Sequence, residues 1–182
     1  MDIESTYQKI MQELSLGHRG LQKFNSAELE VLEAELENSL DSRNLPQLEK
    51  LLCLIEHSTN NHPKFEASLI LALNSDLPDP LIVFSLNAAR KHIIQARFQR
   101  GLRLEFDFLE SLKKLLHAKS PEVVEWTLRT IEECSNQGVY FLREFDKIKP
   151  PPWKWFNAHH RAVREIITLL ERRWSRFEKP KP

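Results

Sequence analysis

Apolar residues recur every three or four positions along most of the chain, the spacing that places side chains on one face of an α-helix. A long example is the series Ile82, Leu86, Ala89, Ile93 and Ala96, with spacings of 4, 3, 4 and 3 residues. No segment has a convincing alternation of apolar and polar residues, which is typical of a half-buried β-strand. The pattern therefore predicts an all-α protein.

Polar caps, prolines and glycines divide this pattern into separate helices. Asn25 and Glu28 are spaced for a capping box. Ser120-Pro121-Glu122 combines a capping serine, a proline at the first helical position and an acid in the first turn. Pro150-Pro151-Pro152 predicts extended polyproline geometry, which breaks any helix. The predicted helices cover about 2–15, 25–40, 45–59, 62–73, 79–99, 109–116, 139–147 and 157–176, and one more begins at Ser120.

Three of these helices begin with a similar sequence. The starts are Leu45-Pro46-Gln47-Leu48, Asp79-Pro80-Leu81-Ile82 and Ser120-Pro121-Glu122-Val123, and their prolines lie 34 and 41 residues apart. Each start follows a shorter amphipathic helix, so the helices fall into pairs. Such a period is typical of a helical solenoid, in which every two-helix unit buries its apolar face against its neighbours.

With this repeat the chain resembles HEAT/armadillo-type repeat proteins over about residues 28–176. The best match runs from Leu109 to Cys134, because the segment that begins at Ser120 is similar to the start of the second helix of a HEAT unit. The arginine that usually follows the valine in HEAT units is absent, since Val124 and Glu125 follow Val123. This departure indicates a divergent array.

The resemblance implies an all-α, right-handed helical solenoid of about four HEAT-like helix pairs with an N-terminal capping helix. The second helices of such a solenoid usually line its concave face, which is a natural binding surface. A plain irregular helical bundle is the alternative. We expect one solenoid domain over residues 1–178, made of an N-terminal cap and turn (1–24), HEAT-like repeats (25–148), a proline/tryptophan linker (149–156) and a C-terminal capping helix (157–177), with a frayed tail at 179–182.

Composition favours one globular domain without a membrane span. Of the 182 residues, 41% are apolar and 29% charged, and only four are glycine, which argues against a turn-rich β fold or a phosphate-cradling glycine loop. The N-terminus has no basic or apolar region of a signal peptide, and no apolar run is long enough to cross a membrane. Two cysteines do not make a disulfide framework. We therefore expect a cytoplasmic protein with no membrane partner.

The charge of the chain is balanced overall but divided between its halves. Residues 1–90 carry 7 Lys/Arg and 14 Asp/Glu, whereas residues 91–182 carry 19 and 12. Such a division of charge is typical of proteins that bind an anionic partner or that self-associate through oppositely charged faces. It also arises when exposed helix faces simply carry charge.

No catalytic signature is present in the sequence. It contains none of the motifs GxGxxG, GxxxxGK[ST], HExxH, GxSxG or CxxC. Cys53 and His57 share a helix face at a spacing that metal ligands use, but two ligands do not make a site. His159 and His160 are adjacent, so on a helix they point about 100° apart and do not easily share an ion. We predict no catalytic residue, no cofactor and no metal.

Basic and aromatic residues of the second half give the best binding signal. Guanidinium groups and flat rings suit anionic ligands, because they combine attraction, forked hydrogen bonds and stacking. The tryptophans of the linker have an alternative interpretation as buried anchors that attach it to the last helix. The candidate partner-binding residues are Arg90, Arg97, Trp126, Arg129, Trp153, Trp155, His160, Arg161 and Arg164.

Two function classes follow from these observations. The first is a non-enzymatic interaction module or scaffold that binds another protein on its concave face. The alternative is a nucleic-acid or phosphate-binding repeat protein that uses the basic second half. An enzyme of unknown type is a third, weaker hypothesis. A continuous positive stripe would favour nucleic acid, and a mixed groove would favour a protein partner.

Overall fold

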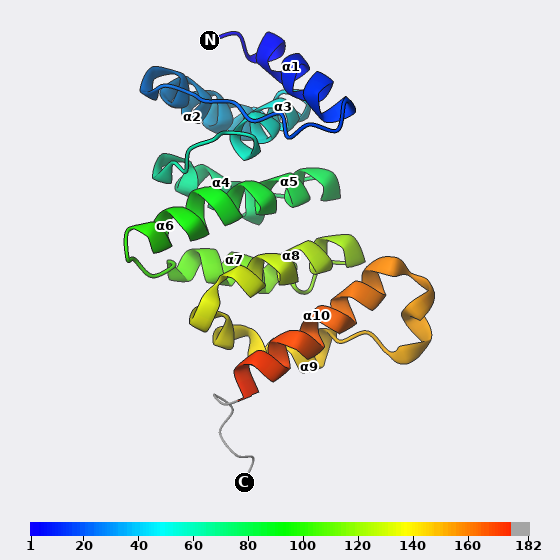
Figure 1. Cartoon of the computed structure of the whole chain (residues 1–182). Helices are drawn as coiled ribbons and strands as arrows, with labels where there is room; N and C mark the ends of the chain where they lie inside the picture. Colours follow the sequence, from blue (N-terminus) through cyan, green and yellow to red (C-terminus); the bar gives the residue numbers. More distant parts are fainter. Residues whose placement is uncertain (176–182) are drawn as a thin grey trace. The chain divides into compact units, whose positions relative to one another are not determined.

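The computed structural model describes residues 1–175, apart from the side chains of Lys154 and Trp155. The predicted tail at 179–182 lies outside the described residues. Within residues 1–175 the chain is all-helical and forms no strand, with one isolated parallel bridge between Gln22 and Ser58 (Figure 1). The chain divides into two compact units, Met1–Arg103 and Leu104–Pro182. The predicted single solenoid domain would join these units and stays a prediction.

Unit 1 contains five helices of more than one turn, the last of which changes its geometry along its length. The elements of unit 1 are α1 (Ile3–Ser15), α2 (Ser26–Asp41), α3 (Leu45–Glu56), the short 3-10 helix η1 (Pro63–Phe65), α4 (Glu66–Asn74), α5 (Asp79–Ala89), the π-helix η2 (Arg90–Gln95) and α6 (Ala96–Gln99).

Unit 2 has the same alternation of helices and short connections. Its elements are α7 (Phe106–Leu115), α8 (Pro121–Glu133), the 3-10 helix η3 (Ser135–Phe141), α9 (Leu142–Ile148), the 3-10 helix η4 (Pro152–Phe156) and α10 (Ala158–Trp174).

The helix starts confirm one of the two predicted side-chain caps. Asn25 and Glu28 form the capping box of α2, because each side chain accepts a hydrogen bond from the backbone N–H of the other. A cap that the sequence did not predict is Asn44, which accepts from the backbone N–H of Gln47 at 3.3 Å at the start of α3. The predicted cap at Ser120 is wrong in one respect: Ser120 holds the N-cap position of α8, but its side chain makes no cap hydrogen bond.

Packing inside unit 1 follows the order of the helix pairs. The first helices contact each other (α2 with α4), and so do the second helices (α3 with α5), while α1 covers α3. Leu48, Leu51, Leu52 and Leu54 of α3 are fully buried as a result. Burial on several sides explains why α3 carries more apolar positions than a single stripe would need.

A π-helical segment that the sequence did not predict lies within the long helix of 79–99, where His92 is fully buried. His92 Nδ1 accepts from the backbone N–H of His62 at 3.0 Å, and Nε2 lies 2.9 Å from the carbonyl oxygen of Ile55. These partners assign a neutral ring that donates through Nε2. Phe65 meets the ring edge to face at 5.1 Å. Burial lowers the pKa of His92 to about 4.

The neutral His92 makes unit 1 sensitive to acid. Its pKa is about 4 in the folded chain, against 6.5 for a histidine in water, so an unfolded chain binds a proton that the folded chain excludes as the pH falls. This difference removes roughly 3 kcal/mol of unfolding free energy between pH 6.5 and pH 4. Urea unfolding followed by far-UV circular dichroism over this range measures the loss.

The variant His92→Gln is expected to be less stable at neutral pH but to lose less stability on acidification. His18→Gln, at an exposed histidine, is the control and keeps the wild-type dependence. All four tryptophans lie in unit 2, so tryptophan fluorescence reports that unit separately. Equal pH slopes for His92→Gln and the wild type would contradict the assignment.

Unit 2 is organised around α8, which contacts α7, η3 and α10. At the far end of α10, the nearly fully buried Trp174 stacks on Phe145 with ring centroids 6.4 Å apart. The backbone of Gly138 approaches the same indole so closely that an added Cβ would lie 2.1 Å from a ring carbon. Glycine is therefore required in η3 by the packing of Trp174 and not by a turn.

The linker between α9 and α10 differs from the predicted extended polyproline run. Residues 149–151 are irregular, but Pro152 already begins the short 3-10 helix η4. Pro150 is buried, and its carbonyl oxygen accepts a 2.9 Å hydrogen bond from Nη1 of Arg164. This bond fixes the start of the linker to α10.

Gly138→Ala is expected to destabilise unit 2 by roughly 1–3 kcal/mol, because the methyl group overpacks against Trp174. Urea unfolding followed by tryptophan fluorescence measures the change. Asn136→Ala, at an exposed position of the same 3-10 helix, should stay within about 0.5 kcal/mol of the wild type. Indistinguishable unfolding midpoints for the two variants would show that the contact does not support the fold.

Candidate functional site

A cavity of about 330 Å³ lies in unit 2 between the α7–α8 connection, the end of α9 and the first turns of α10. Apolar side chains and prolines form much of its wall, among them Leu116, Val124, Ile148 and Val163. Its nitrogen-bearing side chains come from three separate segments. They are His117, Lys119, Lys147, Lys149 and His160. We call this cavity the basic cleft.

Local structure explains how these basic groups meet. Lys119 lies in the turn before α8, and Lys147 lies in the last turn of α9, where a cation interacts favourably with the helix dipole. His160 is in the first turn of α10, and its backbone N–H donates to Oδ1 of the capping Asn157 at 3.1 Å. The hydrogen bond from Arg164 to Pro150 holds the linker beside the same helix.

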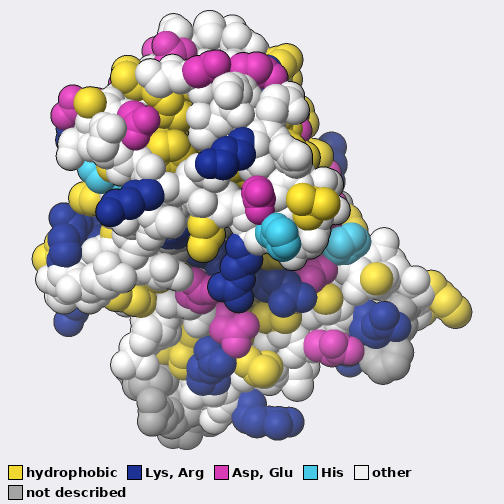
Figure 2. Space-filling view, turned by 45° about the horizontal axis from the view of Figure 1, so that its top comes forward, with side chains coloured by type: hydrophobic (Ala, Val, Ile, Leu, Met, Phe, Trp, Pro, Cys, Tyr) yellow, Lys and Arg dark blue, Asp and Glu magenta, His cyan; other side chains and the backbone are white. Residues whose placement is uncertain are grey.

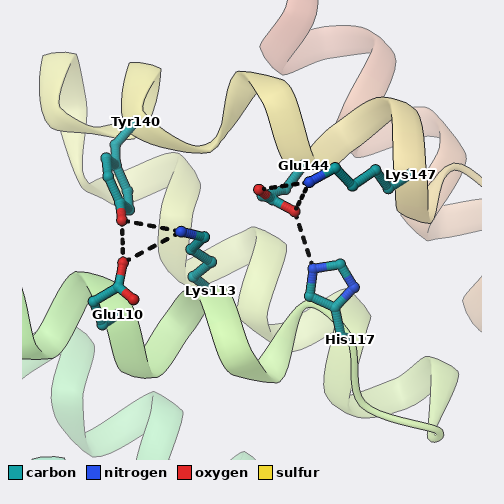
Figure 3. A network of polar contacts seen from close by, with 6 residues as sticks. All are labelled: Glu110, Lys113, His117, Tyr140, Glu144 and Lys147. Atoms are coloured by element: carbon teal, nitrogen blue, oxygen red, sulfur yellow. Dashed lines mark hydrogen bonds and ion pairs between the residues drawn. The ribbon is translucent and has the colours of Figure 1, made fainter.

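Carboxylates hold three of the basic groups in place, and Figure 3 shows two of them, His117 and Lys147. Glu144 of α9 accepts from Nε2 of His117 at 3.1 Å and from Nζ of Lys147 at 3.0 Å. The hydrogen bond from Lys147, followed by that from His117, lowers the pKa of Glu144. Lys149 pairs with Glu171 of α10 at 2.6 Å. Glu144 therefore joins the end of α7 to α9, and Glu171 joins the linker to α10.

A second group of polar contacts lies along α7 in the same view (Figure 3). Tyr140 of η3 donates to Glu110 and accepts from Nζ of Lys113 at 3.3 Å. The hydrogen bond from Tyr140 lowers the pKa of Glu110, with a further contribution from Lys113. This group fixes η3 on α7 and does not line the basic cleft.

Two basic groups of the cleft are not held in this way. Lys119 is exposed and has no hydrogen-bond or ion-pair partner within the described part of the chain. The Nδ1 atom of His160 is shielded from solvent and is also without a partner among residues 1–175. Three lysines and two imidazoles thus meet two carboxylates, so the cleft has spare capacity to donate to an anion.

The structure brings together two other predicted site residues. The guanidinium of Arg129 lies 5.6 Å from the ring centroid of Trp126, within the range of a cation–π contact. Arg129 also pairs with Glu125 at 2.7 Å, and the other oxygen of Glu125 lies 2.8 Å from Nδ1 of His159 on α10. Sequence reasoning missed Glu125 as the centre of this group, although its four-residue spacing from Arg129 was a usable signal.

Two aromatic side chains of η4 are open to solvent. Trp153 is 75% exposed and Phe156 is completely exposed. The alternative interpretation of the linker tryptophans as buried anchors is therefore wrong for Trp153. The side chain of Trp155 lies outside the described residues. Arg161, on the first turn of α10, is also exposed and follows Phe156 closely in the sequence.

The candidates Arg90 and Arg97 belong to unit 1, apart from the basic cleft in the chain. Arg97 donates through Nε to Glu66 at 2.7 Å and through Nη1 to the carbonyl oxygen of Arg103 at 2.9 Å. The Arg97 and Glu66 side chains are only 13% and 14% exposed. Arg90 is partly buried. The geometry gives Arg97 a structural partner inside its own unit.

Unit 1 has a larger and more open hollow, of about 890 Å³. Its lining is mainly amide and hydroxyl groups, with Lys91 as the charged residue at ordinary pH. Burial lowers the pKa of Lys91. The polar side chains are Asn25, Ser26, Thr59, Asn60, Asn61, His62, Lys91, Gln95 and Gln99. This lining has less positive charge than the basic cleft, which is the better candidate for ion binding.

Metal and thiol chemistry find little support in the described residues. No group of three or more His, Cys, Asp or Glu side chains within them is placed to hold a metal ion. Cys53 and Cys134 are buried free thiols, and burial raises the pKa of both, that of Cys53 to about 11. His57 does not form a metal site with Cys53, because its Nδ1 atom lies 2.9 Å from the carbonyl oxygen of Arg19 and is used in that hydrogen bond. No helix in the described region is long and apolar enough to span a bilayer.

Searches of the chain against family models, curated proteins and solved structures find no match.

Arg97→Ala is expected to lower the stability of unit 1 by roughly 3 kcal/mol, because it leaves the largely buried Glu66 without its cation. Far-UV circular dichroism during urea unfolding measures the loss. Arg100→Ala, at an exposed arginine three residues later, is the matched control and should change stability by less than about 0.5 kcal/mol. The double variant Arg97→Ala/Glu66→Ala should lose less than the sum of the two single variants. Additive losses would contradict a direct interaction.

Proposed function

We propose that this protein is a non-enzymatic interaction module with a HEAT-like α-solenoid architecture of about four helix pairs, which binds another protein. The contacts inside each unit support the architecture. The second helix α3 packs on α5 in unit 1, and α8 packs on α10 in unit 2. Packing of second helix on second helix is the arrangement by which repeat proteins bury a continuous core.

The exposed aromatic pair of η4 is the observation that carries the protein-binding proposal. Trp153 and Phe156 lie on η4, which packs against α10 and follows the anchored Pro150 by two residues. Burying a large aromatic ring is favourable, so a ring that stays exposed to water contributes binding free energy when a partner covers it. Such rings are typical anchors of protein interfaces. Anchoring of the segment reduces the entropy lost when a partner covers these rings.

Charge indicates the chemistry of the partner. Arg161 is exposed on the helix against which η4 packs, and unit 2 also holds the basic cleft. We infer a partner protein with an apolar recess for the aromatic pair and acidic side chains around it. Charge complementarity of this kind orients the partner and speeds association.

The distribution of charge favours a protein over a nucleic acid. On the face that Figure 2 shows, Lys and Arg side chains are interspersed with Asp, Glu and hydrophobic side chains. A nucleic-acid footprint would gather basic residues on one face or along one helix. The mixed charge of this face therefore supports the protein-binding hypothesis.

The double variant Trp153→Ala/Phe156→Ala tests the proposal. The immobilised full chain is used to capture proteins, and each captured protein is identified, purified and titrated against the wild type and the variant. The variant is expected to bind roughly 30-fold more weakly, as for loss of an interface hot spot. Its unfolding should stay close to that of the wild type, because Trp153 is 75% exposed and Phe156 is completely exposed.

Leu169→Ala is the matched control, since Leu169 is an exposed apolar residue on α10 and should leave binding unchanged. Equal binding by the wild type and the double variant, or the absence of any captured protein that binds when purified, contradicts the proposal. A salt series with labelled DNA and RNA tests the alternative. Affinity that falls steeply with salt would establish phosphate contacts of a nucleic acid instead.

A further inference from the structure

The lining of the basic cleft suits a more specific ligand than the acidic side chains of a partner protein in general. Its lining combines aliphatic and proline side chains with Lys119, Lys147 and Lys149 and with His117 and His160. Nitrogen donors thus converge from the α7–α8 turn, the end of α9 and the start of α10. Several donors around one small cavity match the three terminal oxygens of a phosphate group better than the two of a carboxylate.

We propose that the basic cleft binds the phosphate group of a phosphorylated serine or threonine in the partner protein. The inference rests on the proposed function in one respect, namely that a protein carries the phosphate. It names a site distinct from the aromatic pair of η4. Lys119 and His160 are the main contacts, and Lys147 and Lys149 surround the phosphate with positive charge.

The groups already held by carboxylates make the cleft preorganised. Glu144 fixes His117 and Lys147, and Glu171 fixes Lys149, so these cations need little reordering when an anion enters. Lys119 is exposed and has no partner among the described residues, so its ammonium group can donate to a phosphate directly. The Nδ1 atom of His160 also has no partner there but is shielded from solvent, so the imidazole has to turn toward the cleft to use it.

The first turn of α8 adds to the attraction. Pro121 lines the cleft as the first residue of this 13-residue helix. The Ser120 side chain makes no cap hydrogen bond, so no capping oxygen occupies this helix end, and Glu122 in the first turn offsets only part of its partial positive charge. The helix end supports the proposal only together with the converging side chains.

The lining also distinguishes a phosphorylated peptide from a nucleic acid. Aliphatic side chains and prolines form its apolar part, and the only rings with π-electrons are the imidazoles of His117 and His160. It contains no Phe, Tyr or Trp on which a base would stack. Such a wall accommodates a phosphate group and the methylene or methyl group that carries it.

Binding of a short peptide to the full chain tests the inference without the partner protein. The probe is Ala-Ala-phosphoserine-Ala-Ala with blocked ends, titrated into isotope-labelled protein and followed by backbone amide NMR shifts. We expect saturable shifts at residues around the α7–α8 turn and the start of α10. The unphosphorylated peptide and the peptide with glutamate in place of phosphoserine should bind at least roughly tenfold more weakly.

Variants separate the cleft from general attraction by positive charge. Lys119→Gln/His160→Gln is expected to weaken binding of the phosphoserine peptide by at least roughly tenfold. Lys114→Gln removes the same charge from an exposed position of α7 outside the cleft and should keep binding within about twofold. Thermal unfolding by circular dichroism checks that both variants are folded, and Lys119→Gln alone serves if the double variant is not.

The outcomes are distinguishable from those for the aromatic pair. Equal weakening by the Lys119/His160 and Lys114 variants, or equal binding of the phosphoserine and glutamate peptides, overturns the inference. Tighter binding of a 5′-phosphorylated oligothymidylate than of the phosphoserine peptide overturns it in favour of nucleic acid. A captured partner that binds unchanged after phosphatase treatment likewise overturns it, while the proposed protein-binding function stands.

Discussion

Two central helices of this chain, α3 and α8, carry more apolar surface than one neighbouring helix can cover, and the fold depends on covering the remainder. In unit 1, α3 meets this constraint by packing on α1, α2 and α5 at once. In unit 2, α8 does so with α7, η3 and α10. Burial of apolar side chains is the main favourable contribution to folding, so these two central helices determine where the others lie.

Polar interactions are built on this packing and set local geometry. His92 bonds two backbone groups next to the π-helical segment, so it links α3, the segment before η1 and the long helix of unit 1. Glu125 joins α8 to α10 through His159, and Glu144 joins α7 to α9 through His117. A buried polar group left without such a partner would cost free energy, which explains why the partners come from neighbouring helices.

Helical periodicity predicted the element order well because it is a local property. The capping box of Asn25 and Glu28 and the proline start of α8 were readable from the sequence for the same reason. The π-helical segment was not, since its geometry depends on contacts of His92 with residues 30 and 37 positions earlier. Gly138 gave no signal either, because its role arises only when Trp174 packs against it.

The candidate site shows the same division between local and distant information. The candidate residues Trp153, Trp126 and Arg129 lay within reach of sequence reasoning, although the exposure of Trp153 and the contact between Arg129 and Trp126 emerged only from the structure. The basic cleft was not within reach, because Lys119 and His160 are 41 positions apart and meet only through the packing of α8 and α10. The basic residues therefore differ mainly in whether each one already has a carboxylate partner within the fold.

That difference separates structural cations from cations able to bind a ligand. Arg97 has a largely buried carboxylate partner, so its charge is already neutralised inside unit 1. Lys147 and Lys149 are paired at the cleft edge, where a stronger anion can share them. Lys119 has no partner among residues 1–175, and neither has the shielded Nδ1 atom of His160. A count of basic residues treats all of these alike, but only a surplus of unpaired donors at one place creates a binding site.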